Sequence, residues 1–348
     1  CIRDRFQEGC RRYVKPGSCI KYKLNTLYYR QTKAFEEKSS NAFSVIRQGG
    51  IYMKKKKLFR KLVSTALCLT LAMGLFTGCS KADSNSAKKI NYQDKKVLRV
   101  GMECAYAPFN WTQETDTLSN GDKAVPIYGT NLYCYGYDVM MAKKIADKLG
   151  WDLEIHKVEW DSIGLSMDAG DYDCIIGGMS WSEEREAAYD FTSEYYFRDV
   201  CLTVKKGSQF ENCTKLSDFA GKNISVTTQL GTAYIDLISQ IPDAKQAAFY
   251  ETTSEAFMAV SNGVADAALI DVPTSESALL TNSDLEILKI DDIESGSSVN
   301  VCIAVRTGDK ELQNLIQGAL DDLNWNEENR AQMDEMMSLA VSLQPAAK

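Results

Sequence analysis

DYDCIIGGMSWSEER, residues 171–185, carries the strongest local signals in the chain. Within it, Cys174 to Ile176 is a short apolar run bounded by charge and glycine, a pattern that predicts a buried strand. A glycine pair follows, and glycine allows a backbone to approach a ligand closely. Ser180 or Ser182 can then cap a helix. Free N–H groups and the helix dipole would meet at this point, so the stretch predicts an anion site.

Arg185 is the unexpected member of this stretch, because the helix dipole disfavours a cation in a first turn. Its planar guanidinium suits a bidentate contact with a carboxylate. On these residues alone, a surface ion pair with Glu183 or Glu184 is an equally open interpretation. Arg185 is therefore either a side chain that binds an anionic ligand or a member of a surface ion pair.

Charge divides the 348-residue chain into two unlike parts. Residues 1–78 hold 17 Lys+Arg and 4 Asp+Glu, whereas the remainder holds 23 and 43, a net charge of −20. An acidic body argues against a nucleic-acid partner and favours cationic small ligands. His156 is the only histidine, which makes a Ser-His-Asp triad or a histidine-rich metal site unexpected. We expect no catalytic residue, no metal and no cofactor.

The segment after Met53, the first methionine, has the order of an export signal. Four lysines come first, an apolar run from Leu62 to Phe76 follows, and Thr77-Gly78-Cys79 ends it. A basic region, an apolar region and a small-residue cleavage site predict a signal peptide over residues 53–78. Cysteine after a small residue resembles the lipobox of bacterial lipoproteins, which implies lipid attachment at Cys79.

Two further N-terminal segments lack the periodicity of folded structure. Residues 79–96 are polar and are expected to form a flexible tether. Residues 1–52 are basic and show no period, and we interpret them as upstream sequence translated through a misplaced start. Both segments are therefore left out of the expected fold.

Strands and helices alternate from residue 97 onward. The expected elements are strands at 97–101, 151–158 and 174–176 and helices at 139–149 and 160–170. Such alternation predicts a parallel α/β sheet that binds ligands at the carboxyl ends of its strands. Glu103, Tyr106 and Trp160 fall at such ends. Residues 112–134 are polar and turn-rich, and they are expected to form a loop excursion.

A second α/β unit repeats the pattern. Its expected strands are at 224–227 and 265–271, its helix is at 252–263, and two closing helices lie at 312–323 and 327–340. Strands at 201–204 and 299–305 are expected to cross between the two units. Two units joined by two crossings predict two lobes with a hinge, and a hinge predicts closure around a ligand.

Seven short motifs, each weak alone, occur in one order along the chain. They are Tyr106–Phe109, Gly136–Val139, Asp171–Asp173, Gly178–Arg185, Asp190–Thr192, Gly231–Thr232 and Ala265–Ala267 with Asp271. From about Leu98 to Met337 they resemble the polar amino-acid-binding proteins of bacterial ABC importers, the extracellular solute-binding family 3 type. The resemblance implies a two-lobed periplasmic-binding-protein fold of type II with two hinge strands. We assign lobe 1 to residues 97–200 and 303–348, and lobe 2 to residues 205–299.

The resemblance also implies a role for each matching residue. By position, Arg185 and Thr232 would hold the α-carboxylate of an amino acid, helped by backbone N–H groups near Ser180 and Ala233. A cationic partner for the carboxylate is chemically reasonable, because a zwitterion needs one fixed cation and one fixed anion, each desolvated only when paired. This implication favours the ligand-binding interpretation of Arg185 over the surface ion pair.

The α-ammonium would be held by a second group of residues. The resemblance implies that Asp271 takes this cation together with the Gly178 carbonyl and the Ser180 hydroxyl. Tyr106 and Trp160 would wall the side-chain pocket, since aromatic rings offer apolar faces and a cation–π surface. Ordinary core packing is the alternative for both aromatics.

Glu103 is expected to select the ligand. Family members that bind cationic amino acids often carry Asp or Glu at this position, and a glutamate there could pair with a guanidinium or ammonium group. Gln229 could reach the ligand from the second lobe. A solvent-facing loop acid is the alternative for Glu103, and it leaves a neutral polar amino acid open as the ligand.

The resulting hypothesis is a monomeric, lipid-anchored receptor at the outer face of the bacterial cytoplasmic membrane. It would deliver an amino acid, expected to be arginine or lysine, to the permease and ATPase subunits of an ABC importer without chemistry of its own. One alternative is an exported dehydratase on the same fold, with Glu103 as the acid that assists loss of water. Another is a sensor partner without transport.

Overall fold

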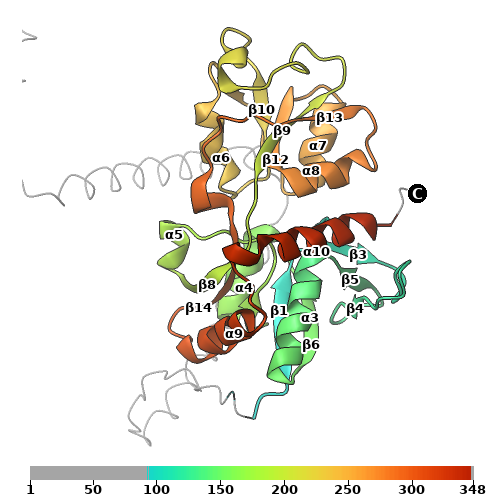
Figure 1. The fold of residues 1–348 in the computed structure, drawn as a ribbon, viewed down its shortest axis with the longest axis vertical. Coiled ribbons are helices and arrows are strands. Elements are labelled where there is room, and N and C mark those ends of the chain that lie inside the picture. Colours follow the sequence, from blue (N-terminus) through green and yellow to red (C-terminus); the bar gives the residue numbers. More distant parts are fainter. Residues whose placement is uncertain (1–91, 93, 346–348) are drawn as a thin grey trace, which may run out of the picture. The chain divides into compact units, whose positions relative to one another are not determined.

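The computed structural model describes Tyr92 and residues 94–345, which belong to a compact unit of residues 88–348. The predicted signal peptide, Cys79 and most of the predicted tether lie outside the described residues. Within the described part, two five-stranded sheets each carry helices, and Figure 1 follows the chain through both. We call the parts built on them lobe 1 and lobe 2.

Lobe 1 contains the sheet with strand order β6-β1-β7-β14-β8. Its strands are β1 (Val97–Met102), β6 (Asp152–Lys157), β7 (Cys174–Ile175), β8 (Tyr189–Tyr196) and β14 (Val301–Arg306). β1 pairs in parallel with β6 and β7, as expected, but β14 runs antiparallel to β7 and β8. The parallel arrangement expected for the strands at 97–101, 151–158 and 174–176 is therefore confirmed. β14 is antiparallel because it returns from lobe 2 and enters the sheet from the edge where the parallel strands end.

Lobe 2 repeats this arrangement with strand order β11-β10-β12-β9-β13. Its strands are β9 (Val200–Lys205), β10 (Ser225–Thr227), β11 (Lys245–Gln246), β12 (Ala267–Asp271) and β13 (Leu285–Leu288). β10 is parallel to β11 and β12, whereas β9 is antiparallel to β12 and β13. The sequence assignment left 201–204 between the lobes, and β9 fills this interval as a strand of lobe 2. The numbered lobe boundaries stay a prediction.

A small antiparallel sheet occupies the region that was expected to be a loop. It has the order β2-β3-β5-β4, with β2 (Ala105–Tyr106), β3 (Asn110–Gln113), β4 (Val125–Pro126) and β5 (Tyr133–Tyr135). Trp111, Val125 and Cys134 of these strands are buried, as is Leu118 between β3 and β4. These apolar residues are too scattered to give a strand pattern in the sequence, which explains the missed prediction.

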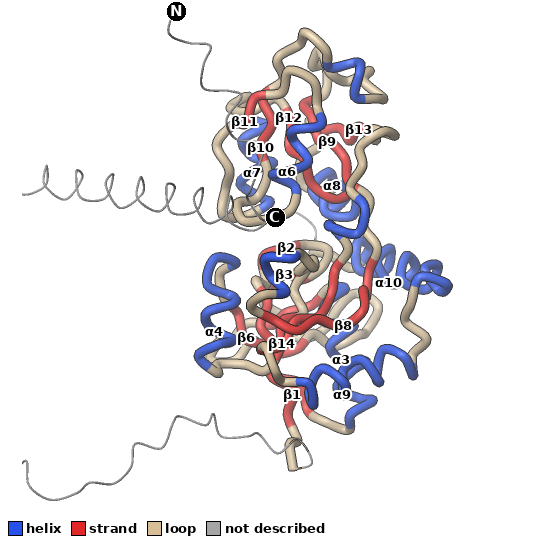
Figure 2. Tube along the Cα trace, turned by 90° about the vertical axis from the view of Figure 1, so that its left-hand side faces the viewer, coloured by secondary structure: helices blue, strands red, loops and turns tan. Residues whose placement is uncertain are grey.

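Helices cover the sheets, and Figure 2 distinguishes them from strands. They are α3 (Tyr137–Leu149), α4 (Ile163–Ala169), α5 (Glu183–Glu186), α6 (Tyr234–Leu237), α7 (Thr253–Ser261), α8 (Val272–Leu279), α9 (Lys310–Asp322) and α10 (Arg330–Ser342). Short 3-10 turns are η2 (Trp160–Ser162), η3 (Leu216–Phe219), η4 (Ile238–Gln240), η5 (Gly296–Val299) and η6 (Glu327–Asn329). In the described part, no helix has both the length and the apolar character needed to span a membrane.

Local sequence explains where several helices begin and end. Gly150 ends α3 with a left-handed φ of 66°, as the sequence predicted. Thr252 and Glu255 form a capping box at the start of α7. The Asp271 carboxylate accepts a hydrogen bond from the Thr274 N–H and so caps α8, with proline in the first turn. Asp271 thus has a structural role besides the predicted one.

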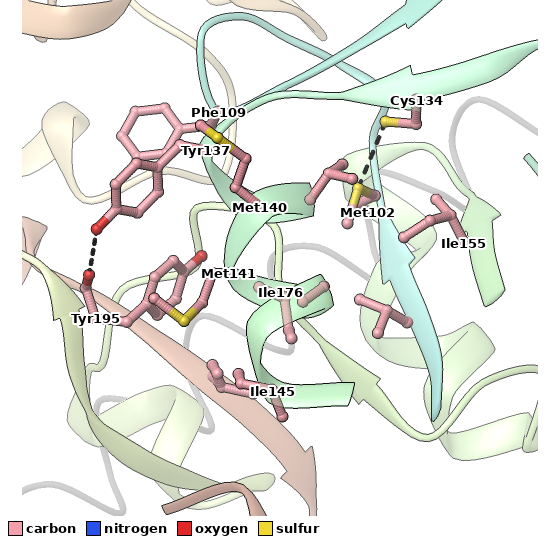
Figure 3. Packing of buried hydrophobic residues seen from close by; sticks show 14 of the residues in the cluster. Met102, Phe109, Cys134, Tyr137, Met140, Met141, Ile145, Ile155, Ile176 and Tyr195 are labelled. Carbon is pink, nitrogen blue, oxygen red and sulfur yellow. Dashed lines mark hydrogen bonds between the residues drawn. The ribbon is translucent and has the colours of Figure 1, made fainter. Parts of the chain in front are cut away.

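The core of lobe 1 lies on both faces of its sheet. Ile303 and Val305 of β14 pack in the larger cluster with residues of α3 and α9, whereas Ala304 between them packs with residues of α4. This alternation is the period of two that a strand imposes. Figure 3 shows part of the larger cluster, including Met141 and Ile145 of α3.

Candidate functional site

A cavity lies where the carboxyl ends of strands from both lobes meet. Strand ends of β1 and β7 and the loop after β10 contribute to its wall. The lining residues are Glu103, Tyr106, Trp160, Gly177, Gly178, Ser180, Arg185, Arg198, Gln229, Thr232, Ala233 and Tyr234. The structure therefore brings all of the predicted ligand-binding residues except Asp271 to one cavity wall.

Gly178 forms part of this wall at a point where another residue would not fit. Its φ is +72°, and an added Cβ would lie 2.6 Å from Cε1 of Tyr106. Its N–H donates to the hydroxyl of Tyr195 (3.2 Å), which in turn donates to Oδ1 of Asp138 (2.7 Å). The buried Asp138 of the Gly136–Val139 motif thus positions the cavity wall through a tyrosine.

Arg185 enters the cavity from the single turn of α5. Ser182 caps this turn by accepting from the backbone N–H of Arg185 (3.2 Å), which settles the choice between the two candidate capping serines. The guanidinium donates to the carbonyl and hydroxyl oxygens of Ser180 (2.8 and 3.0 Å) and to the Gly231 carbonyl (3.0 Å). It also lies over the Trp160 ring, with Cζ 5.5 Å from the centroid.

No ion pair within the described residues involves Arg185. Glu183 and Glu184, the partners in the alternative interpretation, are exposed and make no ion pair with it. Burial lowers the pKa of Arg185, and the charge of Arg198 lowers it further. A guanidinium held by neutral oxygens and an aromatic ring keeps its charge and can still bind the carboxylate of a ligand.

Glu103 follows β1 and is only 3% exposed, so it is not a solvent-facing loop acid. The side-chain amide of Gln229 lies 3.3 and 3.4 Å from its two carboxylate oxygens and 2.8 Å from the Glu251 carbonyl. Burial raises the pKa of Glu103 to about 7, although the Gln229 hydrogen bond lowers it and nearby Glu159 raises it. Among the described residues, no cationic side chain forms an ion pair with Glu103.

Two aromatic side chains border the same cavity. The Trp160 indole N–H donates to the Gly231 carbonyl (3.4 Å), so a lobe 1 side chain contacts a lobe 2 loop. Tyr106 stacks on Phe109 with ring centroids 4.8 Å apart and directs its hydroxyl to Asp271 (2.5 Å). Neither residue is ordinary core packing alone, because both line the cavity.

Asp271 lies behind the wall rather than on it. The residue is fully buried, and its Oδ2 accepts from the hydroxyls of Tyr106 (2.5 Å) and Tyr234 (2.9 Å). Its Oδ1 accepts from the Thr274 N–H (2.9 Å). Asp271 is therefore separated from the cavity by the two phenol rings that the wall contains.

The sequence did not single out two of the lining residues, namely Arg198 and Tyr234. Arg198 had a usable signal, because it is a lone cation in the run Tyr195-Tyr196-Phe197-Arg198 that leads toward the crossing. A buried charge in such a place calls for partners that only the fold can supply. Tyr234 had no signal, since its partner Asp271 is 37 residues away.

Other titratable residues lie outside the cavity wall. His156 contacts Glu154 (Nε2 to Oε1, 2.7 Å) and stacks on Tyr128. The six cysteines of the described part are all buried and form no disulfide. In the same residues, no group of three or more His, Cys, Asp or Glu side chains has the arrangement of a metal site.

The sequence profile of the bacterial extracellular solute-binding proteins, family 3, matches residues 123–335. The chain belongs to this family. This family 3 protein is 27% identical over 272 residues to the arginine-binding extracellular protein ArtP of Bacillus subtilis (strain 168), covering 77% of this chain and 93% of the relative. It is 25% identical to the L-cystine-binding protein TcyJ of Escherichia coli (strain K12), covering 78% and 92%.

Solved structures extend the comparison to the fold. The ancestral amino-acid-binding protein AncCDT-1, described as a precursor of cyclohexadienyl dehydratase, superposes with a TM-score of 0.53 at 26% identity. The match covers 69% of this chain and 94% of that one. The family 3 resemblance and the type II periplasmic-binding fold predicted from the sequence are both confirmed.

Proposed function

We propose that this family 3 protein is the amino-acid receptor of an ABC importer. In this role it captures one amino acid between its lobes and presents it to the permease and ATPase subunits. Attachment of a lipid at Cys79 holds the monomeric receptor at the outer face of the bacterial cytoplasmic membrane. Residues 97–200 with 303–348, and 205–299, move as the two lobes.

One observation carries this proposal. A single cavity between the lobes contains an arginine without an acidic partner, Arg185, and a glutamate without a cationic partner, Glu103, among the described residues. Two opposite charges kept apart in one wall match a ligand that carries both signs, because each becomes paired only when the ligand binds. The α-carboxylate is assigned to Arg185, with Thr232 and the backbone near Ser180 and Ala233.

The preferred ligand is an amino acid with a cationic side chain, arginine or lysine. Glu103 lies at one side of the cavity beside Gln229, and Trp160 and Tyr106 offer ring faces to an extended side chain. The α-ammonium is assigned to the Gly178 carbonyl and the Ser180 hydroxyl, with Asp271 close behind. The arginine-binding relative ArtP supports the same choice.

A neutral polar amino acid is the second candidate. The pKa of Glu103, raised to about 7, leaves a substantial protonated fraction at neutral pH, and a protonated carboxyl can donate to a neutral side chain. The cystine-binding relative TcyJ is in keeping with such a ligand. The response to Glu103→Gln, described in the Discussion, separates the two candidates.

An enzymatic role is the third candidate, and the likeness to AncCDT-1 is its support. A buried carboxyl with a pKa of about 7 has the proton affinity of a general acid. Against it, the other polar groups of the cavity are accounted for by a zwitterion without any reaction. Release of water from a cyclohexadienol acid, measured by absorbance, would replace the receptor proposal if Glu103→Gln abolished it.

A thermal-shift screen of the purified protein against the common amino acids tests the receptor proposal directly. A ligand at 100 times its Kd adds about 2.7 kcal/mol of apparent stability, which moves the unfolding midpoint by several degrees. We expect arginine or lysine to give the largest shift. A screen in which no amino acid moves the midpoint would refute the proposal.

Lipid attachment has a separate test. Replacing Cys79 by Ser removes the thiol that would be acylated, so the exported protein should leave the membrane fraction. Cys213→Ser is a matched control, because Cys213 is buried in lobe 2 and cannot serve as an anchor. Membrane fractionation of both variants, with mass spectrometry of the N-terminus, checks the result, and an unmodified N-terminus in wild type would contradict it.

A further inference from the structure

Asp138 is a buried acid that the proposed function leaves without a role. It belongs to the Gly136–Val139 motif, lies in the first turn of α3 and is fully buried. Its two carboxylate oxygens accept from the Tyr195 hydroxyl (2.7 Å) and from the side-chain amide of Asn110 (2.7 Å). Burial raises the pKa of Asp138 to about 6, and both hydrogen bonds lower it. The carboxyl is therefore mostly ionised at neutral pH and is a strong acceptor.

Tyr195 connects this carboxylate to the cavity wall. Its hydroxyl donates to Asp138 and accepts from the backbone N–H of Gly178 (3.2 Å), which lines the cavity. Because a tyrosine hydroxyl has one proton, Asp138 fixes the direction of that proton and leaves a lone pair for the Gly178 N–H. The Tyr195 ring is fully buried and stacks on Tyr137, so the hydroxyl is held in place.

Gly178 is held by two neighbours. Tyr195 binds its N–H, and the ring of Tyr106 lies where a Cβ would be. Glycine restricts its own backbone less than any other residue, and the φ of +72° is one that other residues rarely adopt. The direction of the Gly178 carbonyl therefore depends on these two neighbours.

We infer that Asp138 and Tyr195 are positioning residues for the α-ammonium of the ligand, which act through Gly178. The inference rests on the proposed function, which assigns the ammonium to the Gly178 carbonyl with the Ser180 hydroxyl and Asp271. Loss of the Tyr195 hydroxyl leaves the Gly178 N–H without its acceptor, and a buried N–H without a partner is costly. The backbone should then turn toward another acceptor, which changes the direction of the carbonyl. The carboxylate and the side chain of the ligand are assigned to other residues, so their contacts should persist.

L-Arginine and 5-guanidinopentanoic acid separate the ammonium from the rest of the ligand, because the second compound is arginine without its α-amino group. Calorimetry gives the ratio of the analogue Kd to the arginine Kd, and displacement of bound arginine extends the measurement to a weakly bound analogue. Tyr195→Phe should weaken arginine binding about tenfold and leave the analogue unchanged, so the ratio should fall about tenfold. Equal weakening of both compounds, as a merely structural role would give, or no weakening of either, would overturn the inference.

Tyr137→Phe is the matched control. Figure 3 shows the Tyr137 hydroxyl donating to the backbone carbonyl of Tyr195 (2.6 Å), which also accepts from the indole N–H of Trp325 (2.8 Å). The variant deletes the same group from the same buried cluster, but this hydroxyl does not contact Gly178, and Trp325 still donates to the carbonyl. The ratio should stay at the wild-type value. A fall as large as that in Tyr195→Phe would contradict the inference, since it would reflect a general loosening of the core.

Asp138→Asn separates the position of the hydroxyl from the charge of the carboxylate. The variant keeps an oxygen acceptor for Tyr195 and removes the negative charge. Asn110 can turn its side-chain amide to meet the introduced amide, because its Oδ1 has no hydrogen-bond partner among the described residues. We expect the ratio to fall less than about threefold. A fall as large as that in Tyr195→Phe would assign the effect to the charge of Asp138 and overturn the inference.

Two further readouts keep the test decisive. If Tyr195→Phe does not fold, Tyr195→Met removes the hydroxyl with a more adaptable side chain, and the same fall in ratio is expected. If wild type prefers another amino acid, that amino acid and the acid that lacks its α-amino group form the corresponding pair. Wild-type protein that bound no amino acid would overturn the proposed function and this inference together. Amino-acid binding with an unaltered ratio in Tyr195→Phe would overturn this inference alone.

Discussion

Arg185 and Arg198 line one cavity, yet their surroundings are opposite in kind. Arg185 is held by two carbonyl oxygens, one hydroxyl and the face of Trp160, all of which are neutral. Arg198 is held by a carbonyl, two phenol side chains and the carboxylate of Asp271. The same side chain is thus left with its charge uncompensated in one place and neutralised in the other.

The difference teaches how a protein can keep a buried arginine ready for a ligand. Neutral oxygens and an aromatic face fix the position of a guanidinium and replace part of its hydration, but they leave its charge in place. A protein carboxylate would also hold the guanidinium in position, but it would neutralise the charge, and the carboxylate of the ligand would then have to displace it. The predictions below either remove this asymmetry or enlarge it.

Arg185→Lys removes the unpaired guanidinium and should have the largest effect. Lysine keeps the charge but loses the planar fork that can bind both carboxylate oxygens. We expect affinity for every accepted amino acid to fall about a hundredfold, close to 3 kcal/mol, by calorimetry. Arg330→Lys, outside the cavity, serves as the control. Equal affinities in Arg185→Lys and wild type would remove Arg185 from the site.

Glu103→Gln tests the anionic counterpart of Arg185. The substitution keeps the shape and the contact with Gln229 but removes the carboxylate. Affinity for arginine should fall by about 2 kcal/mol, while affinity for citrulline should barely change, since only the cation loses a partner. If the protein binds a neutral amino acid tightly, ignores arginine and is indifferent to the substitution, the neutral-ligand candidate replaces the cationic one.

Tyr106→Phe tests the compensated arginine instead. It deletes the hydroxyl between Arg198 and Asp271 and leaves one hydrogen-bonding position of each buried group unfilled. We expect a loss of about 1.5 kcal/mol in the free energy of unfolding, measured by urea denaturation. Tyr135→Phe removes a hydroxyl that donates to the exposed Asp122 (2.8 Å) and should cost less. A larger loss in the control would mean that the buried hydroxyl is dispensable.

The smallest expected effect is a pH dependence of arginine binding. The pKa of Glu103 is about 7 because burial disfavours its charge, with Glu159 and Asp161 raising it and Lys157 lowering it. A cation binds the ionised form, so the arginine Kd should rise about tenfold from pH 8 to pH 6, and Glu103→Gln should flatten the profile. A wild-type profile that is flat in this range would contradict the assignment.

The raised pKa of Glu103 also makes the stability of the fold depend on pH. A carboxyl whose pKa is raised from 4.5 to about 7 on folding stabilises the folded state fully below pH 4.5. That contribution is lost as the pH rises to 7 and through it. Thermal unfolding midpoints of wild type, compared with those of Glu103→Gln across pH 4 to 8, should therefore diverge as the pH rises.

Most strands and helices of the two lobes could be predicted from the sequence, because the residue patterns that specify them are local. The strand before Gly177, the helix that ends at Gly150 and the helix that begins after Thr252 each depend on neighbours within a few residues. The small sheet around Val125 was missed. Its strands pair across a long polar segment, and their apolar residues are too few to show a period.

The site divides in the same way. Arg185, Glu103 and Gln229 could be predicted, because Arg185 lies in a family motif, Glu103 follows the first strand, and the family resemblance suggested Gln229. The enclosure of Asp271 could not be predicted. It requires Tyr106, Tyr234 and Arg198 to converge on the carboxylate from separate elements of both lobes. No spacing within the chain encodes that convergence, so it could not be predicted without the fold.

Because the thiols of the described part are buried, a fluorescent dye can be attached at one introduced cysteine to report ligand binding. All six cysteines of the described part are inaccessible, whereas Leu230 is 42% exposed beside Gly231, whose carbonyl contacts Arg185. Leu230→Cys would therefore offer maleimide dyes a reactive site at the junction of the lobes, without competition from those six thiols. A solvent-sensitive fluorophore attached there would convert occupancy of the cavity into a change of emission.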